Sequence, residues 1–130
     1  MAKQFTDGEG FGKLLGLETT ERGDGLSRCR IVVRPELINP HGTVHGGVVY
    51  SMADNGMGAA LYSHLEVSES CATIEIKMVY IAAVTSGVLE CESRVINKGR
   101  RVAVLESEVR NGDRLVAKAL GTFAIFPLKA

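Results

Sequence analysis

The sequence predicts an α+β domain in which a curved antiparallel sheet wraps around one long central helix. Three observations support this prediction: one long apolar segment of helical character, a series of strand-like segments, and a length that suits one domain. The chain has 130 residues, of which 45% are hydrophobic, so residues 1–130 can form a single domain with a sizeable core. One helix covers only one face of such a sheet.

The first half of the chain is expected to contain one strand and the helix. Residues 11–17 (FGKLLGL) indicate a short helical or irregular lead-in, and residues 26–33 (LSRCRIVV) alternate like a strand with one wet face. After a loop at 36–43, a helix is expected over about 45–65, with a broad apolar surface that indicates enclosure. Gly56 and Gly58 would each weaken an isolated helix by roughly 0.5–1 kcal/mol relative to alanine, which predicts close approach of another backbone.

The second half predicts an antiparallel meander. Alternating apolar residues indicate strands over 73–81, 88–96, 101–110 and 115–126. Turn residues separate them, and Asn111-Gly112 is a strong two-residue hairpin signal. The chain contains no internal repeat, low-complexity segment or linker.

Composition argues against several functional classes. Lys plus Arg equals Asp plus Glu, 15 each, so a nucleic-acid or membrane-surface partner is not expected. The first residues lack the apolar core of a signal peptide, and the longest charge-free run, 37–53, contains Asn, Pro and His, so no membrane span is expected. The three cysteines are far apart and show no CxxC spacing, which favours a reducing, cytoplasmic location.

The segment NPHGTVHGGVVYSMADNGMG, residues 39–58, contains the most unusual pattern. An ionised Asp54 is costly to enclose unpaired, so it lies either on a solvated edge or in surroundings that tune it as a base or nucleophile. His45-Gly46-Gly47 falls where a helix exposes unpartnered amides and a partial positive charge. Glycine would let a ligand oxygen approach these amides, as in an oxyanion site, or could simply permit a tight bend.

Other chemistries have weaker support. His41 and His45 have i, i+4 spacing, but no third ligand has good spacing, so no metal is expected. Ser51 does not lie in a nucleophile elbow. The basic residues Lys98, Arg100 and Arg101 form either a solvated hairpin turn or a site for the phosphates of a ligand.

Gly46 and Asp54 are eight residues apart, which is about 12 Å of helical rise. They cannot both reach one reacting carbonyl within a chain, so a shared function requires two subunits. Two such helices packed antiparallel across a two-fold axis would bring Gly46 of one toward Asp54 of the other. We expect the small residues Gly56, Gly58, Ala59 and Ala60 to permit that approach.

The segment Asn39 to Gly47, followed by Asp54 nine residues after His45, resembles the hotdog-fold acyl-CoA thioesterases of the phenylacetyl-CoA thioesterase type. The resemblance continues through residues 80–83, Gly87, the turn at 98–100 and the final strand at 121–123, and so covers nearly the whole chain. The fold that it implies, a sheet wrapped around a long helix, agrees with the pattern-based prediction.

The resemblance also implies roles for individual residues. Asp54 matches the catalytic carboxylate, a general base or nucleophile, and the Gly46 amide matches the donor that polarises the thioester carbonyl. Asn39 matches the residue that helps position the thioester or water, and His45 the residue that shapes the N-terminal end of the site. Thr73 falls, after a one-residue shift, where related enzymes place a hydroxyl that orients water or the carboxylate, although it shares strand parity with the polar Glu75 and Lys77.

Together these observations predict a cytoplasmic acyl-CoA thioesterase that releases a free acid and coenzyme A. Lys98, Arg100 and Arg101 are candidates for the coenzyme A phosphates, and no other cofactor is expected because coenzyme A is part of the substrate. We expect a homodimer with shared sites, assembled as a tetramer from two dimers. Two alternatives stay open: a non-catalytic acyl-CoA binding or sensing module, and a hydratase or dehydratase of the same fold. The acyl group is not fixed, since Tyr50, Met52, Met57, Tyr62 and Met78 suit either a pocket or a core.

Overall fold

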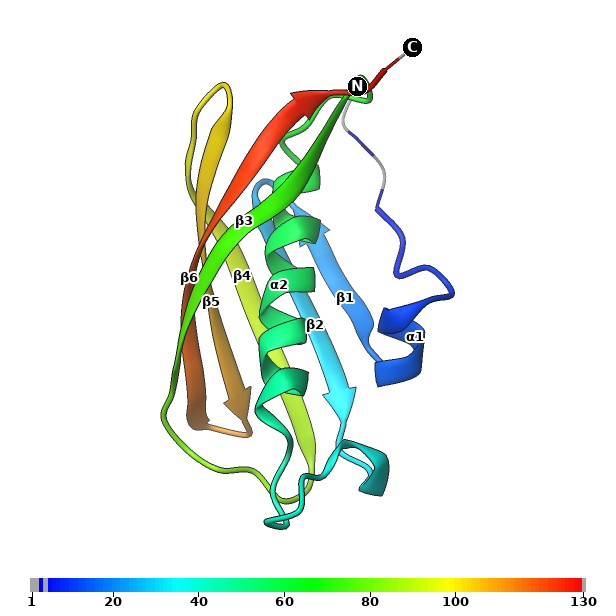
Figure 1. Ribbon diagram of the computed structural model, residues 1–130, viewed down its shortest axis with the longest axis vertical. Coiled ribbons are helices and arrows are strands. Elements are labelled where there is room, and N and C mark those ends of the chain that lie inside the picture. The colour runs from blue at the N-terminus through cyan, green and yellow to red at the C-terminus, as the bar shows by residue number, and fades with distance from the viewer. Residues whose placement is uncertain (1–2, 4, 130) are drawn as a thin grey trace.

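The computed structural model describes residue 3 and residues 5–129. It shows a six-stranded antiparallel sheet that curves around one long helix (Figure 1). The strand order across the sheet is β1-β2-β4-β5-β6-β3. The helical elements are α1 (Phe11–Leu15), η1 (Pro35–Leu37) and α2 (Gly46–Tyr62), and the strands are β1 (Glu18–Gly23), β2 (Leu26–Val32), β3 (Glu69–Tyr80), β4 (Val88–Lys98), β5 (Val102–Asn111) and β6 (Arg114–Pro127). The predicted α+β arrangement is confirmed.

Three elements differ from the prediction. The sequence of β1, ETTERG, has no apolar alternation because β1 is a largely exposed edge strand, so its pattern gave no signal. Strand β3 begins at Glu69, four residues earlier than expected. Helix α2 ends at Tyr62, and the next residue, Ser63, donates to the Ala60 carbonyl at 2.8 Å and accepts from the Gly25 amide at 2.7 Å.

Helix α2 packs closely on the sheet because residue 56 is glycine. A Cβ added to Gly56 would lie 2.4 Å from the Ser93 hydroxyl of β4. The predicted approach of another backbone is therefore wrong at this position, because the Ser93 side chain occupies the space beside Gly56 instead. At Gly58 the nearest atom to an added Cβ is a Phe123 ring carbon at 4.0 Å, so glycine is not required there by contacts within this chain.

The expectation that four small residues of α2 face a partner helix is wrong for three of them. Gly56, Ala59 and Ala60 are buried against the sheet of their own chain, and only Gly58 is partly exposed. The close contact of this part of α2 is with its own sheet, so any partner must approach the other side of the helix.

The core fills the space between α2 and the sheet. Met52 and Met57 of α2 are fully buried there, together with Ile31, Leu89 and Leu105 of the strands. Burial of each such side chain contributes about 1.5–3 kcal/mol to folding. The two methionines are therefore core residues, and Tyr62 and Met78 are partly buried against the core. Tyr50, on the exposed side of α2, is the most accessible of the five candidates for contact with a ligand.

Candidate active site

Asp54 lies in the middle of α2, on the side of the helix that the sheet does not cover, and it is half-buried. Its carboxylate oxygen Oδ1 accepts a hydrogen bond of 2.6 Å from the Thr73 hydroxyl of β3. The carboxylate is thus held in one orientation while it stays accessible to solvent. This geometry suits a base or nucleophile better than a buried structural charge.

A β-bulge explains how Thr73 reaches Asp54. The pairing of β3 with β6 shifts by one residue between Thr73 and Glu75, so that Thr73 pairs with the buried Phe123 but Glu75 pairs with Thr122. The extra residue, Ile74, changes which side chains point toward the helix. The expectation that Thr73 shares the polar face of Glu75 and Lys77 is therefore wrong, and the contact that the resemblance implied is present.

The first turn of α2 carries the backbone amide of Gly46. His45 is the N-cap residue, and its ring nitrogen Nδ1 accepts a 2.8 Å hydrogen bond from the Gly47 amide. The Gly46 amide has no acceptor among the residues that the structure describes. Helix N-termini carry partial positive charge, so this partly exposed amide can polarise a carbonyl oxygen or stabilise an oxyanion.

Tyr80, at the end of β3, is a residue of this site to which the sequence assigned no role. Its hydroxyl donates a 2.7 Å hydrogen bond to the Gly46 carbonyl. Its ring would lie 3.3 Å from a Cβ on Gly46. Partial burial, with a smaller effect from Tyr50, raises the pKa of the Tyr80 phenol, so it stays a donor at neutral pH. Sequence offers no signal for this contact, which joins residues 34 positions apart.

Asn39 organises the loop before α2. Its side-chain oxygen Oδ1 accepts from the His41 amide at 2.9 Å and the Thr43 amide at 3.2 Å, and its Nδ2 donates to the Thr43 hydroxyl at 3.0 Å. The side chain thus fixes the path of the chain into the helix. Its expected role in positioning a thioester or water stays a prediction.

The structure does not bring Asp54 and Gly46 together within one chain. Both lie on the uninterrupted helix α2, about 12 Å apart along its axis. The candidate site therefore has two separate halves, the Asp54–Thr73 pair and the amide end formed by His45, Gly46 and Tyr80.

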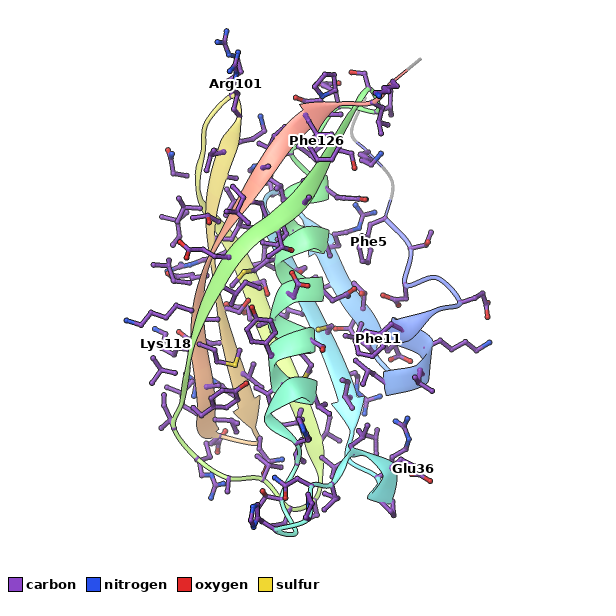
Figure 2. The ribbon with its side chains drawn as sticks, in the orientation of Figure 1. Phe5, Phe11, Glu36, Arg101, Lys118 and Phe126 are labelled. Atoms are coloured by element: carbon purple, nitrogen blue, oxygen red, sulfur yellow. The ribbon has the colours of Figure 1, made fainter. Side chains whose placement is uncertain are left out.

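The basic cluster lies at the end of the molecule away from the N-terminus of α2, around the β4–β5 hairpin that carries Arg101 (Figure 2). Arg100 and Arg101 line a mainly apolar cavity of about 440 Å³ together with Phe126 and Glu69, whereas Lys98 does not line it. A cavity with two guanidinium groups at its margin can hold the phosphates of a ligand.

Residue 3 and residues 5–129 contain no group of three or more His, Cys, Asp or Glu side chains that could hold a metal ion. No helix among these residues is long and apolar enough to cross a membrane.

Comparison with known proteins places the chain in a family. Residues 41–118, which contain Gly46, Asp54, Thr73 and Tyr80, match the model of the thioesterase superfamily. The chain belongs to the thioesterase superfamily. It is 31% identical over 113 residues, 86% of this chain and 75% of the other, to a protein of Saccharolobus solfataricus provisionally named an esterase.

Solved structures agree with this assignment. A conserved protein of Pseudomonas aeruginosa is 41% identical, with a TM-score of 0.88 and coverage of 91% of this chain and 94% of that one. A mutant of the phenylacetic acid degradation protein PaaI of Thermus thermophilus is 26% identical, with a TM-score of 0.83 and coverage of 89% and 98%. The fold of this superfamily member is the hotdog thioesterase fold.

Proposed function

We propose that this superfamily member hydrolyses an acyl-CoA or aryl-acyl-CoA thioester to the free acid and coenzyme A. The observation that supports this most is the presence on one helix of a hydrogen-bonded carboxylate, Asp54, and an N-terminal amide, that of Gly46, which has no acceptor in the described part of the chain. Thioester hydrolysis requires these two parts: a group that activates the attack and a donor for the oxyanion.

The proposed step begins with the thioester carbonyl oxygen on the Gly46 amide. Asp54 removes a proton from water, whose oxygen forms the new bond to the carbonyl carbon. The carbon–sulfur bond then breaks, and the proton passes to the departing thiolate, which leaves as the coenzyme A thiol. A direct attack by Asp54, through an anhydride that water later cleaves, gives the same products.

We propose that each site is shared by two chains, since the two halves lie too far apart on one helix. The β3 edge of the sheet offers the surface for this contact. It is a 12-residue edge strand, and Ile74, Val79 and Ile81 along or just beyond it are each more than half exposed. Long apolar edges of this kind favour pairing with another chain.

The face of the sheet that points away from α2 is less suited to contact with a second chain. It carries cross-strand ion pairs, such as Arg28–Glu92 at 2.8 Å and Arg94–Glu106 at 2.7 Å. Such exposed charges are well solvated. A two-fold axis beside β3 and α2 would instead place Gly46 of one chain near Asp54 of its partner, giving two identical sites per dimer.

The cavity beside the β4–β5 hairpin provides a place for the nucleotide of coenzyme A. We propose that Arg100 and Arg101 bind its phosphates, with Lys98 close by on the same hairpin. Phe126, which is 41% exposed and lines the same cavity, offers an aromatic surface for the adenine ring.

The direct test is thiol release from a panel of acyl-CoA thioesters, including acetyl-, octanoyl- and phenylacetyl-CoA, followed with a thiol reagent. We expect steady release from at least one member. Tight binding without release would refute the thioesterase and indicate an acyl-CoA binding module. Loss of the acyl double bond without free thiol, using an enoyl-CoA, would indicate a hydratase.

A mixing experiment tests the shared site. The two variants are Asp54→Ala and Gly46→Pro. The second removes the amide hydrogen at the first helical position, where proline is favoured, and His45 already has the extended ψ of 133° that a residue before proline needs. Each homodimer should be inactive, because each lacks one half of both sites.

Refolding the two variants together should restore about a quarter of wild-type activity, because half of the dimers would be mixed and each would contain one intact site. A mixture that stays inactive while the wild type releases thiol would contradict the shared site and leave the thioesterase function standing. Native mass spectrometry of the wild type should show a dimer or a multiple of it.

A further inference from the structure

Two side chains hold one peptide group at the start of α2 from its opposite ends. The Tyr80 phenol donates a 2.7 Å hydrogen bond to the Gly46 carbonyl. The Gly47 amide donates a 2.8 Å hydrogen bond to the ring nitrogen Nδ1 of His45. That carbonyl and that amide belong to the same planar group, the peptide that joins Gly46 to Gly47. In a trans peptide the C=O and N–H bonds point in opposite directions, so the two hydrogen bonds together fix how this group is rotated.

Tyr80 is held by the sheet and not by the loop that leads into α2. It is the last residue of β3 and pairs with Ala117 of β6. The next amide along the chain, that of Ile81, donates to the Val116 carbonyl at 2.7 Å. The phenol therefore reaches the helix from a fixed strand end, 34 residues away along the chain.

The ring of Tyr80 also covers one side of Gly46. A Cβ added to Gly46 would lie 3.3 Å from both the ring carbon Cζ and the hydroxyl oxygen of Tyr80. Glycine at this position makes room for the ring, but glycine also leaves the backbone torsions at the start of the helix weakly restricted. Because helix ends fray, a helix that begins with two glycines needs support from outside. Tyr80 and His45 supply that support.

The Gly46 amide is the proposed donor to the thioester carbonyl, and it belongs to the neighbouring peptide group. Among the described residues it has no acceptor, so no hydrogen bond of its own sets its direction. The two peptide groups are joined at the Gly46 Cα, and the direction of this amide therefore depends on the group that Tyr80 and His45 hold. A donor to an oxyanion acts over about 2.7–3.1 Å, so a small rotation weakens it.

We infer that Tyr80 is a positioning residue of the proposed thioesterase: its hydroxyl holds the Gly46–Gly47 peptide and thereby directs the Gly46 amide at the thioester carbonyl. This inference rests on the proposed function. Tyr80 forms no bond to the substrate and transfers no proton in this role. Partial burial, with a smaller effect from Tyr50, raises the pKa of the Tyr80 phenol, so the hydroxyl keeps its proton at neutral pH. The phenol also polarises the peptide, which strengthens the bond from Gly47 to His45.

The test compares two hydroxyl groups in the same turn of α2. Tyr80→Phe removes the phenol hydroxyl and keeps the ring against Gly46. Ser51→Ala is the matched control, because the Ser51 hydroxyl donates an equally short bond, 2.7 Å, to the carbonyl of Gly47. That carbonyl belongs to the next peptide group, whose amide is that of Val48. Each variant loses one bond from a hydroxyl to a carbonyl, but only Tyr80→Phe releases the Gly46–Gly47 peptide.

The first measurement is the rate of thiol release from an acyl-CoA that the wild type hydrolyses. Tyr80→Phe should lower kcat about three- to tenfold, the effect of one neutral hydrogen bond, and keep KM within about twofold. Ser51→Ala should keep both constants within about twofold. An unchanged kcat in Tyr80→Phe, or an equal fall in Ser51→Ala, would overturn the inference. A change confined to KM would overturn it too, because it would mean that Tyr80 contacts the substrate directly.

A double-mutant cycle with His45→Ala tests whether the two side chains act through one peptide group. Once either side chain is removed, the peptide can rotate, so removal of the other should cost less. The fall in kcat of the double variant should therefore be at least threefold smaller than the product of the two single falls. A fall equal to that product would show that Tyr80 and His45 act separately, which contradicts the inference.

An NMR measurement on the protein without substrate makes the test independent of catalysis. Tyr80→Phe should move the Gly47 amide proton upfield, because its bond to His45 weakens, and leave that of Val48 nearly unchanged. Ser51→Ala should move the Val48 amide proton and leave that of Gly47. If no acyl-CoA yields thiol, the proposed function fails, and the Gly47 resonance still decides whether Tyr80 holds the peptide. A Gly47 resonance that Tyr80→Phe does not move would refute this.

Discussion

The two sides of α2 differ in whether their polar groups are paired by hydrogen bonds. On the buried side, Ser27 donates to the Gly56 carbonyl at 2.6 Å, and the Ser93 and Ser107 hydroxyls are 2.6 Å apart. These three serines, at most 1% exposed, face one another on neighbouring strands. On the open side, Asp54 keeps solvent access and the Gly46 amide has no acceptor in the described part of the chain.

This difference shows how one helix can be both a scaffold and a site. Buried polar groups destabilise a fold unless they are paired, so the serine hydroxyls complete the packing and leave little capacity for a ligand. The open side retains unsatisfied hydrogen-bonding capacity, which a substrate can use. Substitutions on the open side should therefore change catalysis, and substitutions on the buried side should change stability.

The largest expected effect comes from the open side. Asp54→Ala should lower kcat by about 10²–10⁴, because the proposed base or nucleophile is lost. The melting temperature and subunit mass should stay close to those of the wild type, since among the described residues the carboxylate accepts a hydrogen bond only from Thr73. Thiol-release kinetics and differential scanning calorimetry measure the two properties. Full activity in this variant would refute the mechanism.

The reactivity of the cysteines provides a second test of the difference between the open and the buried side of α2. Burial raises the pKa of the Cys71 thiol to about 11, with a smaller contribution from nearby Asp54. A raised thiol pKa means less thiolate at neutral pH. Compared with the ordinary value of 9.0, alkylation at pH 7–8 should be about a hundredfold slower than for an exposed thiol.

Peptide mapping by mass spectrometry would follow alkylation at each cysteine. Cys29 and Cys91, buried beneath α2, should react more slowly still, because they become accessible only when the helix leaves the sheet. Rapid alkylation of Cys29 in the native protein would contradict this prediction, because it would show that α2 separates easily from the sheet.

The next effect concerns the buried side alone. Gly56→Ala places a Cβ 2.4 Å from the Ser93 hydroxyl, and such overpacking should lower the free energy of unfolding by ~1–3 kcal/mol. Gly58→Ala is the matched control, with no atom nearer than 4.0 Å, and should be neutral or stabilising by up to ~1 kcal/mol. Urea denaturation measures both, and equal stabilities would contradict the packing account.

The smallest effect should come from Thr73→Val. It removes the 2.6 Å hydrogen bond to Asp54 and keeps a β-branched side chain. Hydrogen bonds to charged groups contribute about 1.5–3 kcal/mol, and this bond is exposed, so we expect about a tenfold fall in kcat. Thr73→Ser retains the hydroxyl and should retain most activity. A kcat for Thr73→Val equal to that of the wild type would remove Thr73 from the site.

Several features were predictable because their signals are local. The apolar run from Val48 to Leu61 sets the helix, and the alternating segments and the Asn111-Gly112 turn set the meander. The spacing of Gly46 and Asp54 fixes their separation along any helix that contains both. These inferences use only the periods of regular structure, so one sequence is enough for them.

Other features depend on contacts between distant parts of the chain. Strand β1 has no apolar period to reveal it, and Tyr80 meets Gly46 only because β3 ends beside the first turn of α2. Gly56, Ala59 and Ala60 are also buried against the sheet, so the composition of the helix alone did not show which side of α2 is exposed to solvent.

The sequence by itself determined the order of the strands from β2 onward, the one long helix and the separation of Gly46 and Asp54 along it. Only the tertiary structure decided that Thr73 points at Asp54, that Tyr80 reaches Gly46, and which side of α2 meets solvent. The physical reason is that periodicity is a property of neighbouring residues. A bulge such as the one between Thr73 and Glu75 instead follows from the register in which two whole strands pack around the core.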